Sequence, residues 1–393
     1  MKFNQWTLGL AAVGIVSLAS AAKAEEKANM VQTALSSTTI SGYVDTSAQW
    51  NLGTGNANLP QYKFGGASKA DGFNLDVVQV RIEKPLDEAE WAAGYRVDLW
   101  AGPDANALGT SSTGTANDFA VRQAYVALRT PVGNGLDWKV GVFDSILGYE
   151  SVESGNNPNY TRSYGHSIEP QTHTGALASY RFSDLISAAV GMANTVTAPI
   201  NGRDPNNESY KTYMASVAVT APEDMGFLAG STLYGGFVNG FANRQDPTSA
   251  AVNLDNSISY YMGATIATPV TGLRLGTAFD LLDVYNQSGE TWAASVYASF
   301  QASEKLSLHL RGEYLKDRGE QKTLTAMASD KTMAITGTVQ YDLWKNVISR
   351  LEMRWDHSLS GTDEFGNGPV VGGVTTPDQV NAVMVALNLI YKF

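Results

Sequence analysis

The end of the chain shows most clearly the pattern that decides the fold. Residues 382–393 read AVMVALNLIYKF, in which every second residue, from Val383 to Phe393, is large and apolar. The residues between them are mixed and include Asn388 and Lys392. A side-chain period of two over this length predicts a β-strand with one fully apolar face.

The same alternation recurs towards the N-terminus. In residues 39–50, Ile40, Val44 and Trp50 share one face, and Ser41 and Asp45 share the other. Further segments with this period are 91–99, 138–142, 258–266, 306–311 and 350–356. Counted this way, the sequence predicts about sixteen strands between residues 38 and 393.

The connections between these segments alternate in length. Short ones lie at 85–90, 130–136, 183–185, 222–226, 269–272, 303–305 and 344–346. Generally longer ones lie at 51–72, 101–118, 144–172, 196–209, 242–255, 285–290, 317–331 and 360–378. Outer-membrane barrels have short periplasmic turns, longer outer loops and an even strand number. The prediction is therefore an all-β fold, a transmembrane antiparallel up-and-down β-barrel of about 16 strands over residues 38–393.

The N-terminus has the features of an export signal. Lys2 precedes an apolar run over residues 7–19, and Ala22-Lys23-Ala24 offers a small-x-small cleavage site. We expect residues 1–24 to be a cleaved signal peptide and residues 25–37 to be a short periplasmic segment. Cleavage removes two lysines and no acid, so the net charge of −11 becomes −13. Such an acidic chain is not expected to bind nucleic acid.

A barrel of this size predicts a water-filled channel. In hydrocarbon every backbone polar group must be paired, so strands must close without edges, and sixteen strands leave an aqueous lumen. An Arg or Lys that faced lipid at mid-bilayer would cost roughly 2–4 kcal/mol. The alternation therefore directs these pore-lining candidates inward: Arg81, Arg96, Asp98, Lys139, Arg181, Arg311, Glu313, Arg350, Glu352 and Arg354.

The connection at 144–172 is the longest and carries most of the functional hypothesis. Loops of this length are usually functional or disordered, and its Tyr, Pro and Arg residues favour an ordered insert. It is the third outer loop of the predicted barrel. By analogy with general porins, in which the third outer loop narrows the lumen, we expect this connection to fold into the channel. The candidates for a constriction opposite the wall arginines are Asp144, Glu150, Glu153, Arg162 and Glu169.

Several stretches resemble one family of membrane proteins. They are 40–47 (ISGYVDTS), 122–135 (RQAYVALRTPVGNG), 140–144 (VGVFD) and 157–165 (NPNYTRSYG). Together they look like the putative beta-barrel porin-2 family of OmpL-like outer-membrane proteins, with the sharpest motifs between residues 120 and 175. The resemblance implies a porin-like barrel in a Gram-negative outer membrane. It brings no substrate and no catalytic residues.

The predicted function is a porin for small hydrophilic solutes or ions, without a cofactor, metal or enzymatic activity. Its predicted partners are outer-membrane lipids and the outer-membrane assembly machinery, which would recognise Phe393 at the end of the last strand. A barrel of this size is also compatible with a homotrimer. One alternative is a structural or adhesive barrel without transport. Another is a barrel hydrolase, which would need a nucleophile and a base that a third group orients. Ser307 and His309 lie two residues apart on one face, but nothing in the sequence marks them for this chemistry.

Overall fold

The structure is a computed structural model that describes residues 31–32, 37–112, 117–204, 208–242, 256–285, 290–317 and 330–393. The predicted signal peptide (1–24) and most of the predicted periplasmic segment (25–37) lie outside these residues. Among the residues described, no helix is long and apolar enough to cross a membrane.

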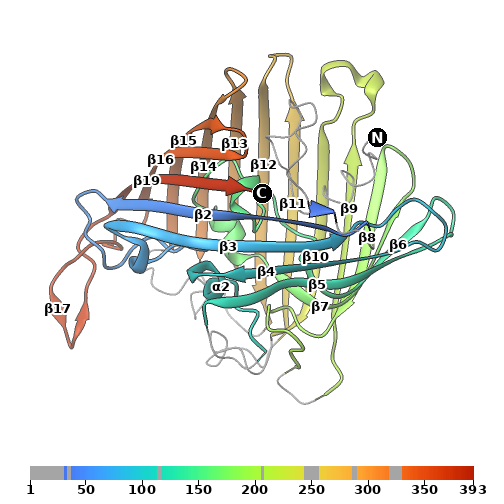
Figure 1. The fold of residues 1–393 in the computed structure, drawn as a ribbon. Coiled ribbons are helices and arrows are strands. Elements are labelled where there is room, and N and C mark those ends of the chain that lie inside the picture. The colour runs from blue at the N-terminus through green and yellow to red at the C-terminus, as the bar shows by residue number, and fades with distance from the viewer. Residues whose placement is uncertain are drawn as a thin grey trace.

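Sixteen long antiparallel strands form the described part of the fold, as predicted from the alternating sequence (Figure 1). The first eight are β2 (Thr39–Asn51), β3 (Gly72–Lys84), β4 (Ala93–Ala101), β5 (Phe119–Thr130), β6 (Leu136–Asp144), β7 (Thr172–Arg181), β8 (Ile186–Ala193) and β9 (Thr212–Thr220). The other eight are β10 (Thr232–Phe241), β11 (Asn256–Ala267), β12 (Leu273–Val284), β13 (Thr291–Gln301), β14 (Leu306–Asp317), β15 (Lys331–Trp344), β16 (Val347–Ser358) and β19 (Asn381–Lys392).

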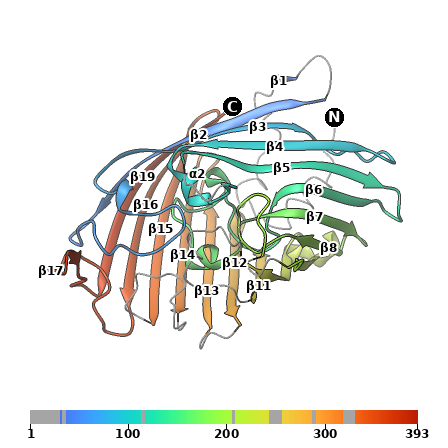
Figure 2. The same cartoon turned by 90° about the horizontal axis from the view of Figure 1, so that it is seen from below.

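The sheet closes on itself. Each strand pairs with the next along the chain, and β19 pairs with β2, with Ile390 opposite Asp45. The two-residue β1 (Val31–Gln32) adds to the start of β2, and Figures 1 and 2 show both ends of the sheet meeting at β19 and β2. A closed antiparallel sheet has no free edge, which is the condition for strands in a bilayer.

The barrel wall is apolar on its outer face and charged on its inner face, which is the reverse of a water-soluble β-sandwich. On β16, Leu351 and Met353 point outward and are 50% and 55% exposed, whereas Glu352 and Arg354 point inward and are fully buried. Apolar side chains outside and charged side chains inside suit a barrel surrounded by lipid. The outward direction of the apolar face, and not the alternation itself, therefore distinguishes this barrel from a sandwich.

Short elements occupy the connections. The long connections carry η1 (Ala67–Lys69), α2 (Pro103–Leu108), η2 (Ser154–Asn156), α3 (Tyr164–Ile168) and a hairpin of β17 (Val370–Val371) and β18 (Val374–Thr375). One of the turns at the opposite end holds η3 (Glu223–Leu228). Figure 2 shows α2 inside the ring of strands, where Leu108 packs with Trp100 and Val152.

The connection between β6 and β7 spans residues 145–171 and is called the inner loop below. It supplies apolar side chains to clusters inside the barrel: Leu147 and Tyr149 pack with residues of β7 to β13, and Tyr164 packs with residues of β13 to β15. The sequence predicted an interior lined by polar and charged side chains. The structure also contains apolar clusters inside the barrel, which the sequence did not predict. They arise because the loop itself carries large apolar residues that the barrel wall then covers.

Candidate functional site

The inner loop lies across the interior of the barrel, and nearly all its residues are buried. Wall residues of β14 to β16 hold one side of it, and a cluster of charges on β3 to β6 holds the other. These two attachments define the candidate site.

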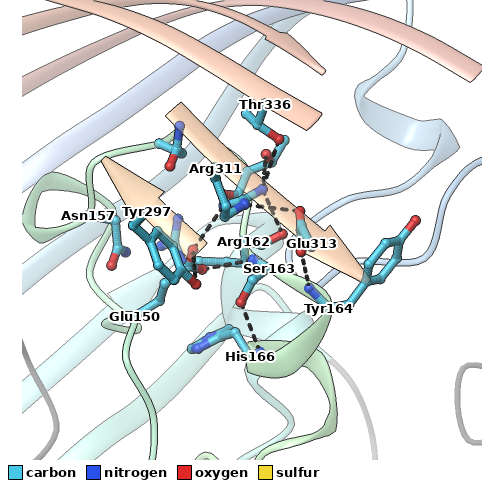
Figure 3. A network of polar contacts seen from close by, with 12 residues as sticks. Glu150, Asn157, Arg162, Ser163, Tyr164, His166, Tyr297, Arg311, Glu313 and Thr336 are labelled. Carbon is cyan, nitrogen blue, oxygen red and sulfur yellow. Dashed lines mark hydrogen bonds and ion pairs between the residues drawn. The ribbon is translucent and has the colours of Figure 1, made fainter. Parts of the chain in front are cut away.

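Arg311 of β14 makes the most connected attachment (Figure 3). Its Nη1 donates to Glu150 Oε1 at 2.9 Å and to the Thr161 carbonyl oxygen at 2.7 Å. Its Nη2 donates to Thr161 Oγ1 and Thr336 Oγ1, and its Nε donates to Glu313 at 2.9 Å. The guanidinium is fully buried, so all these partners are needed to offset its desolvation.

Carboxylates of the same wall accept hydrogen bonds from the loop backbone. Glu352 accepts from the N–H groups of Tyr160 (2.6 Å) and Thr161 (2.9 Å), and Glu313 accepts from that of Tyr164 (2.7 Å). The Tyr164 hydroxyl also donates to Asp356 at 2.6 Å. Charge-assisted bonds of this kind are about twice as strong as neutral ones, so the loop has a defined position.

Cations of the wall hold loop carbonyl groups. Arg354 donates to the carbonyl of Arg162 at 3.0 Å, and Arg350 donates to those of Ser154 (3.1 Å) and Asn157 (2.7 Å). Lys392 of the last strand donates to the carbonyl of Gly155 at 3.0 Å. A Cβ at residue 155 would lie 2.7 Å from Lys392 Cε, so a larger residue there would displace the end of the lysine side chain.

On the opposite wall, Glu153 of the loop meets three arginines. Arg122 Nη1 lies 2.9 Å and Arg96 Nη2 lies 3.3 Å from Glu153 Oε1, and Arg81 forms a third ion pair with it. Asp98 shares all three arginines. Burial alone would raise the pKa of Glu153, but the three arginines outweigh it and lower the pKa to about 2.

Arg122 is absent from the sequence-based candidates for a physical reason. The β4–β5 register shifts at Asp98 and Leu99, which face Gln123 and Val121 respectively. Arg122 is therefore the extra residue of a bulge, and both Arg122 and Gln123 are buried in the interior. A strict period of two directs only one of two adjacent residues into the barrel, so it cannot place both Arg122 and Gln123 there. Its place in the 122–135 motif was the signal that could have singled it out.

Glu169 has a different environment from the other acidic residues of the loop. Its side chain is hydrogen-bonded to Asp280 of β12, and His166 Nδ1 lies 3.5 Å from Glu169 Oε2. Burial, followed by the charge of Asp280, raises the pKa of Glu169 well above its ordinary value. Burial likewise lowers the pKa of His166 well below its ordinary value. The sequence analysis placed Glu169 opposite an arginine; the structure brings it to another carboxyl group instead.

The remaining candidates are dispersed. Asp144 pairs with Arg122 at the end of β6, and Lys139 Nζ lies 5.0 Å above the ring of Tyr125. Arg162 donates to backbone carbonyls within its own loop, at Ser151, Val152 and Tyr160. Arg181 lies at the β7–β8 turn and pairs with Asp184. Phe393 exchanges two backbone hydrogen bonds with Gly42.

Water contact within the site is uneven. The side chains of Arg81, Arg96, Glu83 and Asp144 keep 17%, 20%, 26% and 22% exposure. The charged groups that face the loop from β14 and β16 keep almost none. The accessible charges of the site therefore lie along β3 to β6.

Serine–histidine pairs and metal centres are two arrangements that many enzymes use. His309 Nδ1 lies 2.8 Å from Ser299 Oγ, and Ser307 donates to Gln301, so these two hydrogen bonds do not join Ser307 to His309. Over the residues that the structure describes, no group of three or more His, Asp or Glu side chains is placed to hold a metal ion.

Comparison with solved structures identifies barrels of the same fold. The chain is similar to an anion-selective porin from Comamonas acidovorans (TM-score 0.60, 12% identity, covering 91% of this chain and 99% of that one). It is also similar to the outer-membrane channel DcaP of Acinetobacter baumannii (TM-score 0.59, 11% identity, 92% and 99%). A third match is OmpT of Vibrio cholerae in its trimer form (TM-score 0.56, 13% identity, 91% and 99%). No curated protein matches the sequence.

A family model described as putative beta-barrel porin-2, OmpL-like matches residues 37–393. This range covers the whole closed barrel and nearly the whole chain. The family resemblance predicted from the sequence motifs is confirmed. The chain is a porin-like outer-membrane barrel and belongs to the putative beta-barrel porin-2, OmpL-like family.

Proposed function

We propose that the chain is a diffusion porin that passes small hydrophilic solutes or ions along its β3–β6 wall, past the inner loop. The observation that carries the proposal is the residual exposure of the charged side chains of that wall, inside a closed sixteen-strand barrel. Groups on the inner face of a membrane barrel can keep water contact only from within. The inner loop is held by β14 to β16 and meets the β3–β6 wall through Glu153, and the charged groups beside that contact keep the exposure that solutes would need.

The charge of this wall is balanced. Arg81, Arg96, Arg122 and Lys139 carry four positive charges, and Glu83, Asp98 and Asp144 of the wall together with Glu153 of the inner loop carry four negative ones. The ion pairs Arg129–Asp137 and Lys69–Asp76 add no net charge. We therefore expect weak selectivity between cations and anions. Solutes that carry both charges, or none, would meet no net electrostatic barrier.

The proposal includes the location and assembly of the protein. Residues 1–24 would direct export and be removed, and the assembly machinery would recognise the last strand through Phe393. Outer-membrane lipids would surround the outward apolar face. The similar OmpT structure in a trimer form supports a homotrimer for this chain as well.

Single-channel recording in planar bilayers tests the proposal. The purified full-length protein should give steady ohmic steps that are small for a sixteen-strand barrel, because the inner loop fills much of the lumen. Liposome swelling with sugars, amino acids and organic acids would then rank the solutes. Loss of swelling with increasing solute size is the expected result.

One observation favours a second candidate function. The inner loop is bonded to both walls, as a plug would be in a structural barrel without transport. Such a barrel would fold and insert but would give no steady steps. Absence of conductance from correctly folded protein would therefore replace the porin by this alternative.

A further inference from the structure

A small cavity lies at the base of the inner loop, where the chain leaves β6 and returns to β7. Among the residues that the structure describes, three that line this cavity are acidic and none is Lys or Arg; the acidic ones are Asp144, Glu150 and Glu169. His166 of α3, which lies beside Glu150 in Figure 3, and Gln171 add polar groups to the same wall. The lining of the cavity therefore favours a cation over an anion.

Several polar atoms of this wall have no hydrogen-bond partner within the described part of the chain. They are both ring nitrogens of His166, Gln171 Oε1 and Asp144 Oδ1. The amide of Gln171 is fixed in this orientation, because its Nε2 donates to the carbonyl oxygens of His166 (2.9 Å) and Glu169 (3.1 Å). His166 and Gln171 are only 2% and 8% exposed. Buried polar atoms without partners are typical of a site that holds a water molecule or an ion.

An ion satisfies this wall better than a single water molecule does. Gln171, Asp144 and Glu169 present acceptor oxygens to the cavity, and a neutral imidazole presents an acceptor nitrogen. A water molecule has only two hydrogens to donate, so it would leave some of these acceptors unpaired. A metal ion takes lone pairs from several of them at once.

His166 and Glu169 have the spacing of two ligands of one metal ion. His166 Nδ1 lies 3.5 Å from Glu169 Oε2, which is longer than a normal hydrogen bond. Two atoms that bind the same Zn²⁺ at about 2.0–2.1 Å in tetrahedral geometry lie about 3.4 Å apart. A side chain at residue 148, where φ is +115°, would be strained and would displace this carboxylate, so Gly148 leaves it in place.

We propose that His166, Glu169 and Gln171 bind a divalent transition-metal ion, with water in the remaining coordination positions. The described chain offers no third His, Asp or Glu for such a site, and the amide oxygen of Gln171 takes that place. Imidazole as a ligand favours Zn²⁺ and similar ions over Mg²⁺ and Ca²⁺, which prefer oxygen alone. The sequence predicted no metal, and this site departs from that prediction.

The ion can reach the site from the proposed solute path. Asp144 lines the cavity and also belongs to the accessible β3–β6 wall, where its side chain is 22% exposed. In the metal-free protein Glu169 is hydrogen-bonded to Asp280, and metal binding would replace this bond and release its proton. Binding of the metal does not depend on whether the barrel conducts, so the two proposals fail separately.

Zinc binding to the full-length protein in detergent tests this site. Chelator-treated protein is titrated with Zn²⁺ in competition with a chromophoric chelator, which gives both affinity and stoichiometry. Wild type should bind one Zn²⁺ per chain with the affinity assigned to this site. His166→Gln and Glu169→Gln should each weaken binding at least about tenfold, since even the partners of metal ligands typically contribute that much. Gln171→Met, which removes only the amide ligand, should weaken it less.

His357 supplies the matched control. It lies at the end of β16, next to the buried Asp356, and its Nδ1 is 2.8 Å from Asn381 Oδ1. His357→Gln should bind Zn²⁺ as wild type does, and all variants should keep the heat-modifiable mobility of a folded barrel. Absence of a Zn²⁺ site in wild type, or equal affinity in wild type and folded His166→Gln, would overturn the proposal. Binding of Mg²⁺ or Ca²⁺ as tight as that of Zn²⁺ would overturn the assignment to a transition metal.

Discussion

Among single residues, Arg311 is expected to fix the position of the inner loop. It joins Glu150 and Thr161 of the loop to Glu313 of its own strand while remaining fully buried. Removal of one partner from a buried ion pair typically costs about 3–5 kcal/mol, because it leaves uncompensated charge.

Arg311→Ala should therefore release the loop while the sixteen backbone ladders keep the barrel closed. We expect a severalfold larger single-channel conductance, with unchanged heat-modifiable mobility. Arg181→Ala, at an exposed turn, is the control and should conduct as wild type does. An Arg311→Ala protein that folds and shows wild-type conductance would exclude Arg311 as the residue that holds the loop.

Glu153 should control the charge selectivity of the proposed path. Glu153→Gln leaves Arg81, Arg96 and Arg122 with one carboxylate fewer, so reversal potentials in a salt gradient should shift towards anions. Asp184→Asn, on an exposed turn, should leave them unchanged.

The arginines lower the pKa of Glu153 to about 2, so its stabilising contribution is complete above its ordinary pKa and disappears only as the pH falls towards 2. Selectivity should accordingly be constant between about pH 5 and 8.

At the scale of elements, the inner loop has an attachment that should weaken in alkali. Glu169 and Asp280 are buried and hydrogen-bonded to each other, which requires at least one shared proton. The other titratable groups that face this pair are His166 and Glu150, with Tyr261 from the wall. Since folding raises the pKa of Glu169, the stabilisation is complete below its ordinary pKa and is lost as the pH rises through the raised value.

Conductance should therefore increase, or become noisier, in wild type as the pH rises above the ordinary pKa of a glutamate and through the raised pKa of Glu169. Glu169→Gln replaces the carboxyl by a neutral hydrogen-bonding group and should remove this pH dependence. Glu153→Gln, at the other attachment, should retain it. The same pH response in wild type and Glu169→Gln would show that the carboxyl pair is not its origin.

The sequence predicts elements better than it predicts contacts between them. The period of two gives the strands, because a slip of one residue would turn Glu352 and Arg354 towards lipid. It cannot give the bulge at Arg122 of β5, which turns that side chain inward, because a bulge leaves the local composition unchanged. Nor can it pair Glu169 with Asp280, since 110 residues separate them and only the closed ring brings β12 to the loop.

For the whole molecule, closure of the sheet determines both where lipid lies and where solutes could pass. β19 meets β2, so a ring of sixteen strands turns apolar side chains to the bilayer and charged ones to the interior. The inner loop is attached to both sides of that interior: the charged groups that hold it at β14 to β16 are fully buried, whereas those around Glu153 at β3 to β6 keep some exposure. The length of the loop was evident in the sequence, but its two attachments depend on which wall carries Arg311 and Glu352 and which carries Arg122.

The most direct test of the account is the single-channel conductance of wild type and of a variant in which residues 150–163 are replaced by a short Gly-Ser linker. Both proteins should fold as heat-modifiable barrels. Wild type should show small, steady ohmic steps, and the variant should show steps severalfold larger, as expected for an unobstructed sixteen-strand lumen. Folded variant protein that shows no conductance, or steps no larger than those of wild type, would contradict the claim that the inner loop narrows a water-filled channel.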